Sequence, residues 1–275
     1  MNSRSILITG CSSGIGLCVA RGLRERGYRV FATARQAADV QRLEAEGLES
    51  LQLDLDDTQS ITRAVDTVLA RTNGQLYALF NNGAYAQVGA VEDLSRAALR
   101  AQFETNLFGW HELTNRILPV MRNQGYGRII HNSSVLGFVA LRFRGAYTAS
   151  KYALEGLTDT LRLELAGSGI HVVLIEPGPV SSRFRANAHA AYQRNIDARN
   201  SPFREHYLAM EQRLTAAGPV VPFTLPPEAV LKKVIRALES RRPKPRYHVT
   251  FPTHLFAVLK RVLSQRALDR VLSRI

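Results

Sequence analysis

Apolar and polar positions along this chain follow two alternating patterns. Short, almost uniformly apolar runs indicate strands buried on both faces, and longer segments between them repeat apolar residues with the period of amphipathic helices. Strands that alternate with helices predict βαβ units. Right-handed crossovers then give an α/β fold, a Rossmann-like doubly wound parallel sheet with helices on both faces. The predicted strands are 4–9, 28–33, 49–53, 76–81, 127–132 and 170–175, and the predicted helices are 14–27, 37–46, 58–72, 95–123 and 146–167.

The pattern changes after Pro177. Residues 178–227 look irregular, with scattered prolines and aromatic side chains, which is typical of a substrate lid. A helix over 227–240, a short strand over 246–250 and two short amphipathic helices over 252–275 complete the chain. We therefore expect one Rossmann-like domain over 1–250 and a basic helical extension over 251–275.

A glycine-rich turn follows the first predicted strand and opens the first predicted helix. It reads Thr9-Gly10-Cys11-Ser12-Ser13-Gly14-Ile15-Gly16. Glycines there let backbone N–H groups approach a pyrophosphate at the helix N-terminus. The spacing is G-x3-G-x-G rather than the commoner G-x-G-x-x-G, and a purely structural turn is the alternative interpretation.

Tyr147 and Lys151 stand four residues apart on a predicted helix and therefore share a face. A phenol with a pKa near 10 is a poor base at neutral pH. We expect the lysine cation to favour the phenolate and lower that pKa, so that the tyrosine can exchange a proton. Taken alone, such a pair is more often an ordinary feature of a helix surface.

Two polar residues upstream change the interpretation of that pair. Ser134 follows the fifth predicted strand, at the carboxyl edge of the sheet where ligands bind, thirteen residues before Tyr147. Its hydroxyl can hydrogen-bond a substrate oxygen beside the phenol. Asn106 interrupts an apolar helical face and, if buried, needs hydrogen-bond partners. A structural role is the alternative for Asn106.

Together these residues resemble the short-chain dehydrogenase/reductase family over roughly residues 4–240, in order and in spacing. The resemblance is closest to the subgroup with retinol and steroid dehydrogenases and bacterial NADP-dependent aldehyde reductases. It implies hydride transfer between a nicotinamide and a carbonyl or alcohol, with Tyr147 as acid/base. It further implies that Lys151 binds the nicotinamide ribose, that Ser134 polarises the carbonyl and that Asn106 supports a proton relay.

The resemblance also implies a set of cofactor contacts. They come from the glycine turn, from the ends of strands three and four, from the catalytic helix and from the segment after Glu176. The implied residues are Gly10, Ser12, Ser13, Gly14, Ile15, Gly16, Asp54, Leu55, Asn81, Asn82, Gly83, Tyr147, Lys151, Pro177, Gly178, Val180 and Ser182. Two positions depart from the family pattern. Asn81-Asn82-Gly83-Ala84 replaces N-N-A-G, and Ser182 replaces a threonine but keeps its hydroxyl.

The end of the second predicted strand bears on cofactor choice. A carboxylate there would hydrogen-bond a ribose 2′-OH and favour NAD. This chain has Thr33-Ala34-Arg35 instead, and the Arg35 guanidinium matches a 2′-phosphate. We expect NADP as the cofactor, and a solvated surface charge is the alternative role of Arg35.

Apolar residues after Ser134, together with the lid aromatics, predict an apolar cleft for an aldehyde, ketone or alcohol; packing of the lid is the alternative role of Phe138, Leu141 and Phe143. Steroid or retinol dehydrogenase activity is a second interpretation of the same site. An NADP-binding sensor or membrane-associated scaffold belongs to another class. The intact Asn–Ser–Tyr–Lys set argues against it, because a pure binding module has no use for a phenol–ammonium pair.

Composition and length argue against several other classes of protein, including membrane-spanning, secreted and metal-binding proteins. A chain of 275 residues with 45% hydrophobic residues can bury a large core. We expect neither a secretory signal nor a membrane-spanning segment, because no apolar run is long enough. Cys11 and Cys18 without a histidine cluster fit a reducing cytoplasm and predict no metal site. No recognised motif supports nucleic-acid binding. The family resemblance implies a homodimer or homotetramer.

The formal net charge of +13 is concentrated near the C-terminus. Residues 232–275 contain twelve Lys or Arg against Glu239 and Asp269, a net +10. Two apolar stripes, 255–263 and 268–275, lie beside a row of Arg266, Arg270 and Arg274. Docking on the core or on a second subunit is one interpretation, and contact with an anionic membrane is the other.

Overall fold

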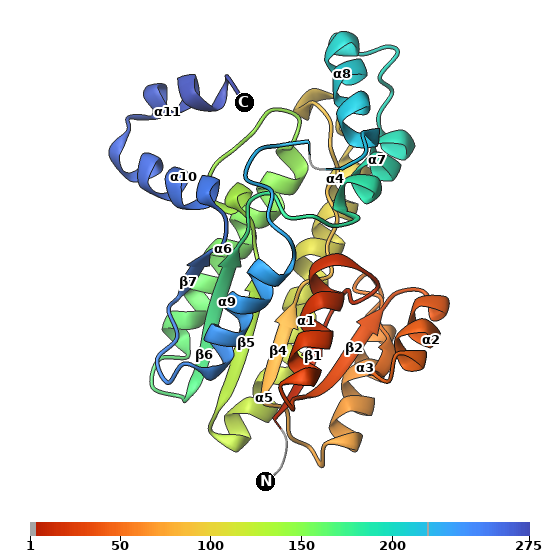
Figure 1. Cartoon of the computed structure of the whole chain (residues 1–275), viewed down its shortest axis with the longest axis vertical. Coiled ribbons are helices and arrows are strands. Elements are labelled where there is room, and N and C mark those ends of the chain that lie inside the picture. The colour runs from red at the N-terminus through yellow and green to blue at the C-terminus, as the bar shows by residue number, and fades with distance from the viewer. Residues whose placement is uncertain (1–3, 219) are drawn as a thin grey trace.

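A computed structural model of the chain describes residues 4–218 and 220–275. Its sheet has seven parallel strands in the order β3-β2-β1-β4-β5-β6-β7 (Figure 1). The order reverses between β1 and β4, which makes the sheet doubly wound and opens a crevice at the carboxyl ends of these strands. The strands are β1 Ser5–Ile8, β2 Arg29–Ala34, β3 Glu49–Gln52, β4 Ala78–Asn81, β5 Gly127–Asn132, β6 Ile170–Glu176 and β7 Arg246–His248.

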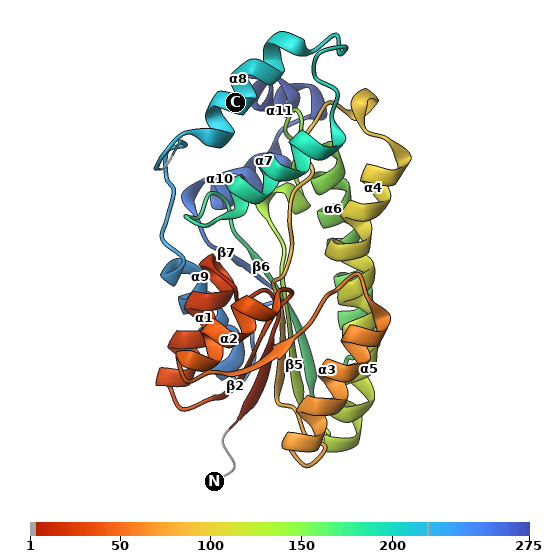
Figure 2. The ribbon, with the colours of Figure 1, turned by 90° about the vertical axis from the view of Figure 1, so that its right-hand side faces the viewer.

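Helices cover both faces of the sheet, as Figure 2 shows from the side. One face packs against α1, α2 and α9, and the other against α3, α5 and α6. Each face has its own apolar core, which explains why the strands are apolar on both sides. The helices are α1 Gly14–Glu25, α2 Ala37–Ala45, α3 Thr58–Arg71, α4 Arg96–Phe103, α5 Gly109–Gln124, α6 Gly145–Glu164 and α9 Glu228–Glu239.

The fold predicted from the sequence is confirmed, and each predicted strand lies within two residues of an observed one. The predicted helix 95–123 is interrupted. A five-residue π-helical turn, Glu104–Phe108, joins α4 to α5 and contains Asn106. Such turns widen the helix by one residue and are frequent at functional sites.

The prediction that residues 178–227 are irregular is wrong in part. They contain α7 Phe184–Asn195 and α8 Arg204–Thr215. Helix α7 buries only Ala188, Ala191 and Tyr192, and these three positions give an apolar period that is too weak to recognise in the sequence. The segment leaves and rejoins the body at one narrow point, where Ser181 N donates to Leu225 O at 3.0 Å.

The C-terminal extension docks on the domain. α10 Phe251–Val262 buries Thr253 and Ala257, and α11 Gln265–Leu272 buries Leu268. The apolar positions over 255–263 are only partly covered, because Val258 is 56% and Val262 68% exposed. Both helices lie near the lid, at the end of the molecule opposite the N-terminus (Figure 1). None of the helices described is long and apolar enough to cross a bilayer.

Candidate active site

A cavity of about 840 Å³ lies at the carboxyl ends of the strands, with walls from the glycine turn, the lid and the C-terminal helices. Most of the residues predicted from the sequence line it. They are Gly10, Ser12, Ser13, Gly14, Ile15, Asn82, Gly83, Ser134, Tyr147, Lys151, Pro177, Gly178, Val180 and Ser182. Gly16, Arg35, Asp54, Leu55, Asn81 and Asn106 are not among the residues described as lining it.

The glycine turn suits an anionic group. Gly10 and Gly14 have φ values of +71° and +56°, which favour glycine, and a Cβ on Gly10 would lie 2.5 Å from Gly83 Cα. Helix α1 begins at Gly14 with no acidic residue in its first turn. Its first backbone N–H groups have no partner within the helix and carry the positive end of the dipole. The turn and the cavity therefore fit the pyrophosphate of a dinucleotide.

Hydrogen bonds clamp the end of β4 against the same turn. Thr9 Oγ1 accepts from Asn82 N at 2.8 Å and Gly83 N at 2.9 Å, and Asn82 Nδ2 donates to Thr9 O at 3.0 Å. The clamp is present despite the inverted order of Gly83 and Ala84. Asn81 points elsewhere, with Nδ2 within 3.1 Å of Thr114 Oγ1.

Helix α6 brings Tyr147 and Lys151 to one wall of the cavity. Lys151 Nζ donates to Asn132 O at 2.8 Å and lies 4.2 Å from the centroid of the Trp110 ring. It lies 5.7 Å from the Tyr147 ring, which also meets Phe184 of the lid edge-on, with centroids 5.3 Å apart. The contact between Lys151 and Trp110 could not be predicted from the sequence, because no local motif distinguishes Trp110 from any other apolar residue on a helix.

Burial dominates the proton chemistry of this pair. It raises the pKa of Tyr147 to about 12, and the Ser134 side chain works in the opposite direction. Burial also lowers the pKa of Lys151 to about 7, against the charge of Glu155. The expectation that the pKa of Tyr147 is lowered is therefore wrong, because burial disfavours the phenolate and outweighs the hydrogen bond from Ser134.

Ser134 and Asn106 occupy defined positions beside the pair. Ser134 Oγ accepts from Leu136 N at 3.1 Å and begins the short helix Val135–Gly137 at the end of β5. Asn106 is fully buried in the π turn, where Nδ2 donates to Tyr85 O at 2.9 Å and Oδ1 accepts from Tyr85 N at 3.2 Å. Its amide is thus satisfied by a backbone loop, and its role in a proton relay stays a prediction.

Two arginines lie after β2, Arg35 at the end of the strand and Arg42 on helix α2. Arg35 is exposed there, and Arg42 Nη2 donates to Ser12 O of the glycine turn at 2.6 Å. Leu55 is buried, and Asp54 Oδ1 accepts from Asp56 N at 3.1 Å. Sequence reasoning missed Arg42, since only the fold carries it from the middle of α2 to the glycine turn.

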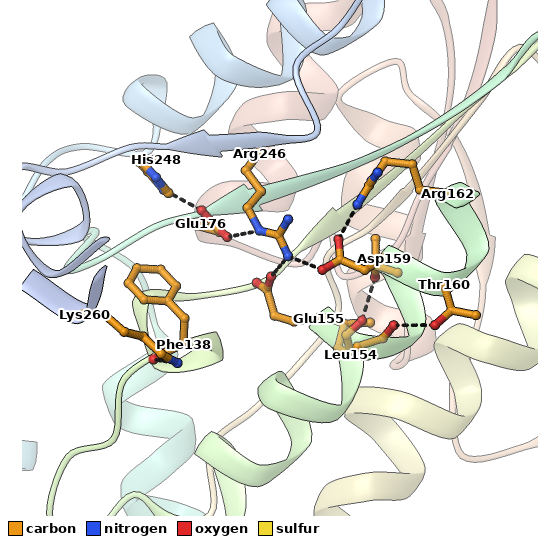
Figure 3. Close-up of polar contacts among 12 residues, drawn as sticks. Phe138, Leu154, Glu155, Asp159, Thr160, Arg162, Glu176, Arg246, His248 and Lys260 are labelled. Carbon is orange, nitrogen blue, oxygen red and sulfur yellow. Dashed lines mark hydrogen bonds and ion pairs between the residues drawn. The ribbon is translucent and has the colours of Figure 1, made fainter. Parts of the chain in front are cut away.

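Behind α6, a buried ion network joins the helix to β6 and β7 (Figure 3). Arg246 contacts Asp159 at 2.6 Å, Glu155 at 3.1 Å and Glu176 at 3.2 Å, and Glu176 also lies 2.5 Å from His248 Nδ1. Burial and the charge of Glu176 raise the pKa of Glu155. This network fixes the back of the catalytic helix.

Comparison with known proteins identifies the family. The sequence model described as short chain dehydrogenase matches residues 4–193. The chain belongs to this family. It is 44% identical to the uncharacterized oxidoreductase YbbO of Escherichia coli K12, over 98% of this chain and 94% of that protein.

Two further relatives extend the comparison. Human retinol dehydrogenase 8 is 32% identical, over 96% of this chain and 87% of that protein. Among solved structures, a variant of actinorhodin polyketide ketoreductase with NADPH shares 28% of its sequence with this chain. The two folds superpose with a TM-score of 0.73, over 90% of this chain and 96% of that one. The chain is thus an oxidoreductase of a family that acts on small molecules with a nicotinamide cofactor.

Proposed function

We propose that this protein is an NADP(H)-dependent oxidoreductase that interconverts an aldehyde or ketone of mainly apolar character and its alcohol. The convergence of Ser134, Tyr147 and Lys151 on a cavity that also contains the glycine turn carries this proposal. Apolar side chains from the catalytic loop and the lid, including Leu141 and Phe184, line the substrate side of the cavity.

The residues divide the chemistry as follows. When bound, the nicotinamide supplies or accepts the hydride. Tyr147 gives its phenolic proton to the substrate oxygen during reduction and takes it back during oxidation. Ser134 holds that oxygen beside the phenol, and Lys151 in its protonated form stabilises the phenolate as it forms.

Replacing Tyr147 with Phe tests the proposal. The variant removes one oxygen from a buried site, so turnover should fall by at least about a hundredfold because the proton donor is gone. A panel of aldehydes, retinoids and steroids, followed by NADPH absorbance, measures turnover and separates aldehyde reduction from a steroid or retinol activity. NADPH binding, measured by fluorescence, should change little.

Two outcomes would contradict the proposal. Near-normal turnover in the variant would remove Tyr147 from the mechanism. Tight NADPH binding by the wild-type protein without turnover of any compound would favour the sensor interpretation instead.

NADP rather than NAD is our proposal for the cofactor. No carboxylate follows β2 until Asp39, which is paired with Arg42 at 3.0 Å. Arg35 is exposed at the end of the strand, and Arg42 reaches the glycine turn. The similar ketoreductase was crystallised with NADPH, which is consistent with this choice.

Contact with an anionic membrane is our proposal for the C-terminal helices of a cytoplasmic enzyme. Helix α10 turns Phe251, Leu255, Val258 and Val262 outward, and all four are exposed. Their spacing of four, three and four residues places them on one stripe. The stripe belongs to the most basic part of the chain, and charge complementarity therefore favours anionic lipid.

A further inference from the structure

Arg144 stands at an unusual place in the cavity. It caps helix α6 three residues before Tyr147, and both residues line the cavity. Its Nη1 donates to the carbonyl oxygen of Phe143 at 3.1 Å and lies 3.5 Å from Met210 Sδ, a weak acceptor. Among the residues described, neither Nε nor Nη2 makes a hydrogen bond, and no carboxylate lies within ion-pair distance of this guanidinium.

No carboxylate in the described lining of the cavity neutralises the positive charge of Arg144. The described lining of the cavity contains no Asp or Glu but one lysine, Lys151, and four arginines: Arg144, Arg183, Arg185 and Arg213. Burial, with the charge of Arg213 adding to it, lowers the pKa of Arg144 to about 10. The group therefore stays charged at neutral pH. By contrast, Arg116 and Arg246 each meet a carboxylate within about 3 Å.

The loop that carries Arg144 is held rigidly. Phe143 adopts a left-handed φ of +59°, which is strained for an aromatic residue. Its carbonyl accepts from Gly89 N at 3.0 Å, and its ring meets Phe203 of the lid edge-on at 5.5 Å. Contacts on both sides thus maintain a conformation that places the guanidinium beside the catalytic helix.

Burying a cation without a partner lowers the stability of the folded protein. An apolar side chain would avoid this loss at a position whose role is purely structural. The free Nε and Nη2 edge of a guanidinium fits a planar carboxylate with two parallel hydrogen bonds. We propose that the carbonyl substrate also carries a carboxylate, which Arg144 binds within the apolar cleft while Arg213 contributes positive charge. This inference rests on the proposed function and specifies its substrate class as an oxo-carboxylate.

The test compares three aldehydes with the same chain, using the NADPH-loaded enzyme. They are 9-oxononanoate, its methyl ester and nonanal. The wild-type kcat/KM for the carboxylate should exceed that for the ester by at least about tenfold, the worth of one charge-assisted hydrogen bond. Arg144→Met should bring this ratio close to one, mainly by raising the KM for the carboxylate, whereas Arg144→Lys should retain part of it.

Arg142→Met is the matched control, because Arg142 is exposed two residues away and is not part of the described cavity lining. It should leave the ratio unchanged. Equal kcat/KM values for acid and ester in the wild type, or an unchanged ratio in Arg144→Met, would overturn the inference while turnover of nonanal still supports the proposed function.

A binding experiment keeps the two proposals apart if no aldehyde is turned over. Calorimetry on the NADPH-loaded protein compares nonanoate with methyl nonanoate. Preferential binding of nonanoate that is lost in Arg144→Met would support the anion site even though the proposed reaction had failed. Equal binding of the two compounds would reject the anion site.

Discussion

Lys151 exposes only 1% of its surface and keeps its ammonium group between a carbonyl oxygen and an indole ring. These contacts offset part of the desolvation of the charge, but the net effect is still to favour the neutral amine. Under the proposed function, the cost of burying this charge is the compromise between stability and activity that is common in active sites.

Replacing Lys151 with Met should stabilise the protein near pH 7 by about 4 to 5 kcal/mol, since one pKa unit corresponds to about 1.4 kcal/mol. Burial lowers the folded-state pKa from 10.5 to about 7. Between these values the unfolded chain binds a proton that the folded chain lacks, so wild-type stability rises with pH. Urea denaturation should show that the difference in unfolding free energy between the variant and the wild type is smaller at pH 9 than at pH 6.5. An equal advantage at both values would contradict this account.

Arg35→Ala should weaken NADPH binding by at least about tenfold and leave NADH binding nearly unchanged, because only NADPH has a 2′-phosphate for the guanidinium to meet. Fluorescence titration with both cofactors measures the effect. Arg63→Ala is the control, since Arg63 is an exposed arginine on α3, and it should change neither affinity. Equal losses for the two cofactors would argue against NADP specificity at this position.

At the scale of elements, the buried ion network decides how firmly β7 is held to the catalytic helix (Figure 3). Arg246 neutralises carboxylates on both α6 and β6. Burial works to raise the pKa of Asp159, but Arg246 and Arg162 more than offset it, so the pKa is lowered. The stability from this pair is present above the usual carboxyl pKa and is lost as pH falls through the lowered value.

Arg246→Met should therefore destabilise the protein by about 3 kcal/mol at pH 7, because it leaves buried carboxylates without their cation. Urea denaturation measures the loss, which should become smaller toward pH 4 as the carboxylates take up protons. Arg162→Met is the matched control. Among the residues described, Arg162 pairs with Asp159 alone, so its effect should stay below about 1 kcal/mol. Similar losses in the two variants would show that the network is not a unit.

The same scale shows what the sequence could predict. The strands were predictable because burial on both faces requires apolar runs, and the glycine turn and Tyr147–Lys151 pair lie close together in sequence. The π turn at Asn106 was not, since one shifted hydrogen bond leaves the apolar period of the long helix intact. The role proposed for Arg144 was not predictable from the sequence either. It depends on the absence of a nearby carboxylate in the described part of the folded protein.

At the scale of the whole molecule, the lid and the C-terminal helices lie at the same end (Figure 1), and both contribute residues to the lining of the cavity. Phe251 and Leu255 belong both to the outward stripe of α10 and to the lining of the cavity. The exposed Phe223 of the lid packs against Phe251 with ring centroids 5.0 Å apart. The apolar surface is therefore continuous from the outside of α10 into the cavity.

If that surface meets a membrane, the full chain should float with vesicles containing phosphatidylserine but not with pure phosphatidylcholine vesicles, and salt should weaken the binding. The double variant Val258→Glu with Val262→Glu should lose it, because it places two carboxylates on the stripe that contacts lipid. Leu163→Glu is the matched control, since Leu163 is 69% exposed on α6, and should bind like the wild type. If the double variant instead dissociates a dimer in light scattering, without any vesicle binding by the wild type, the stripe is an interface between copies of this chain.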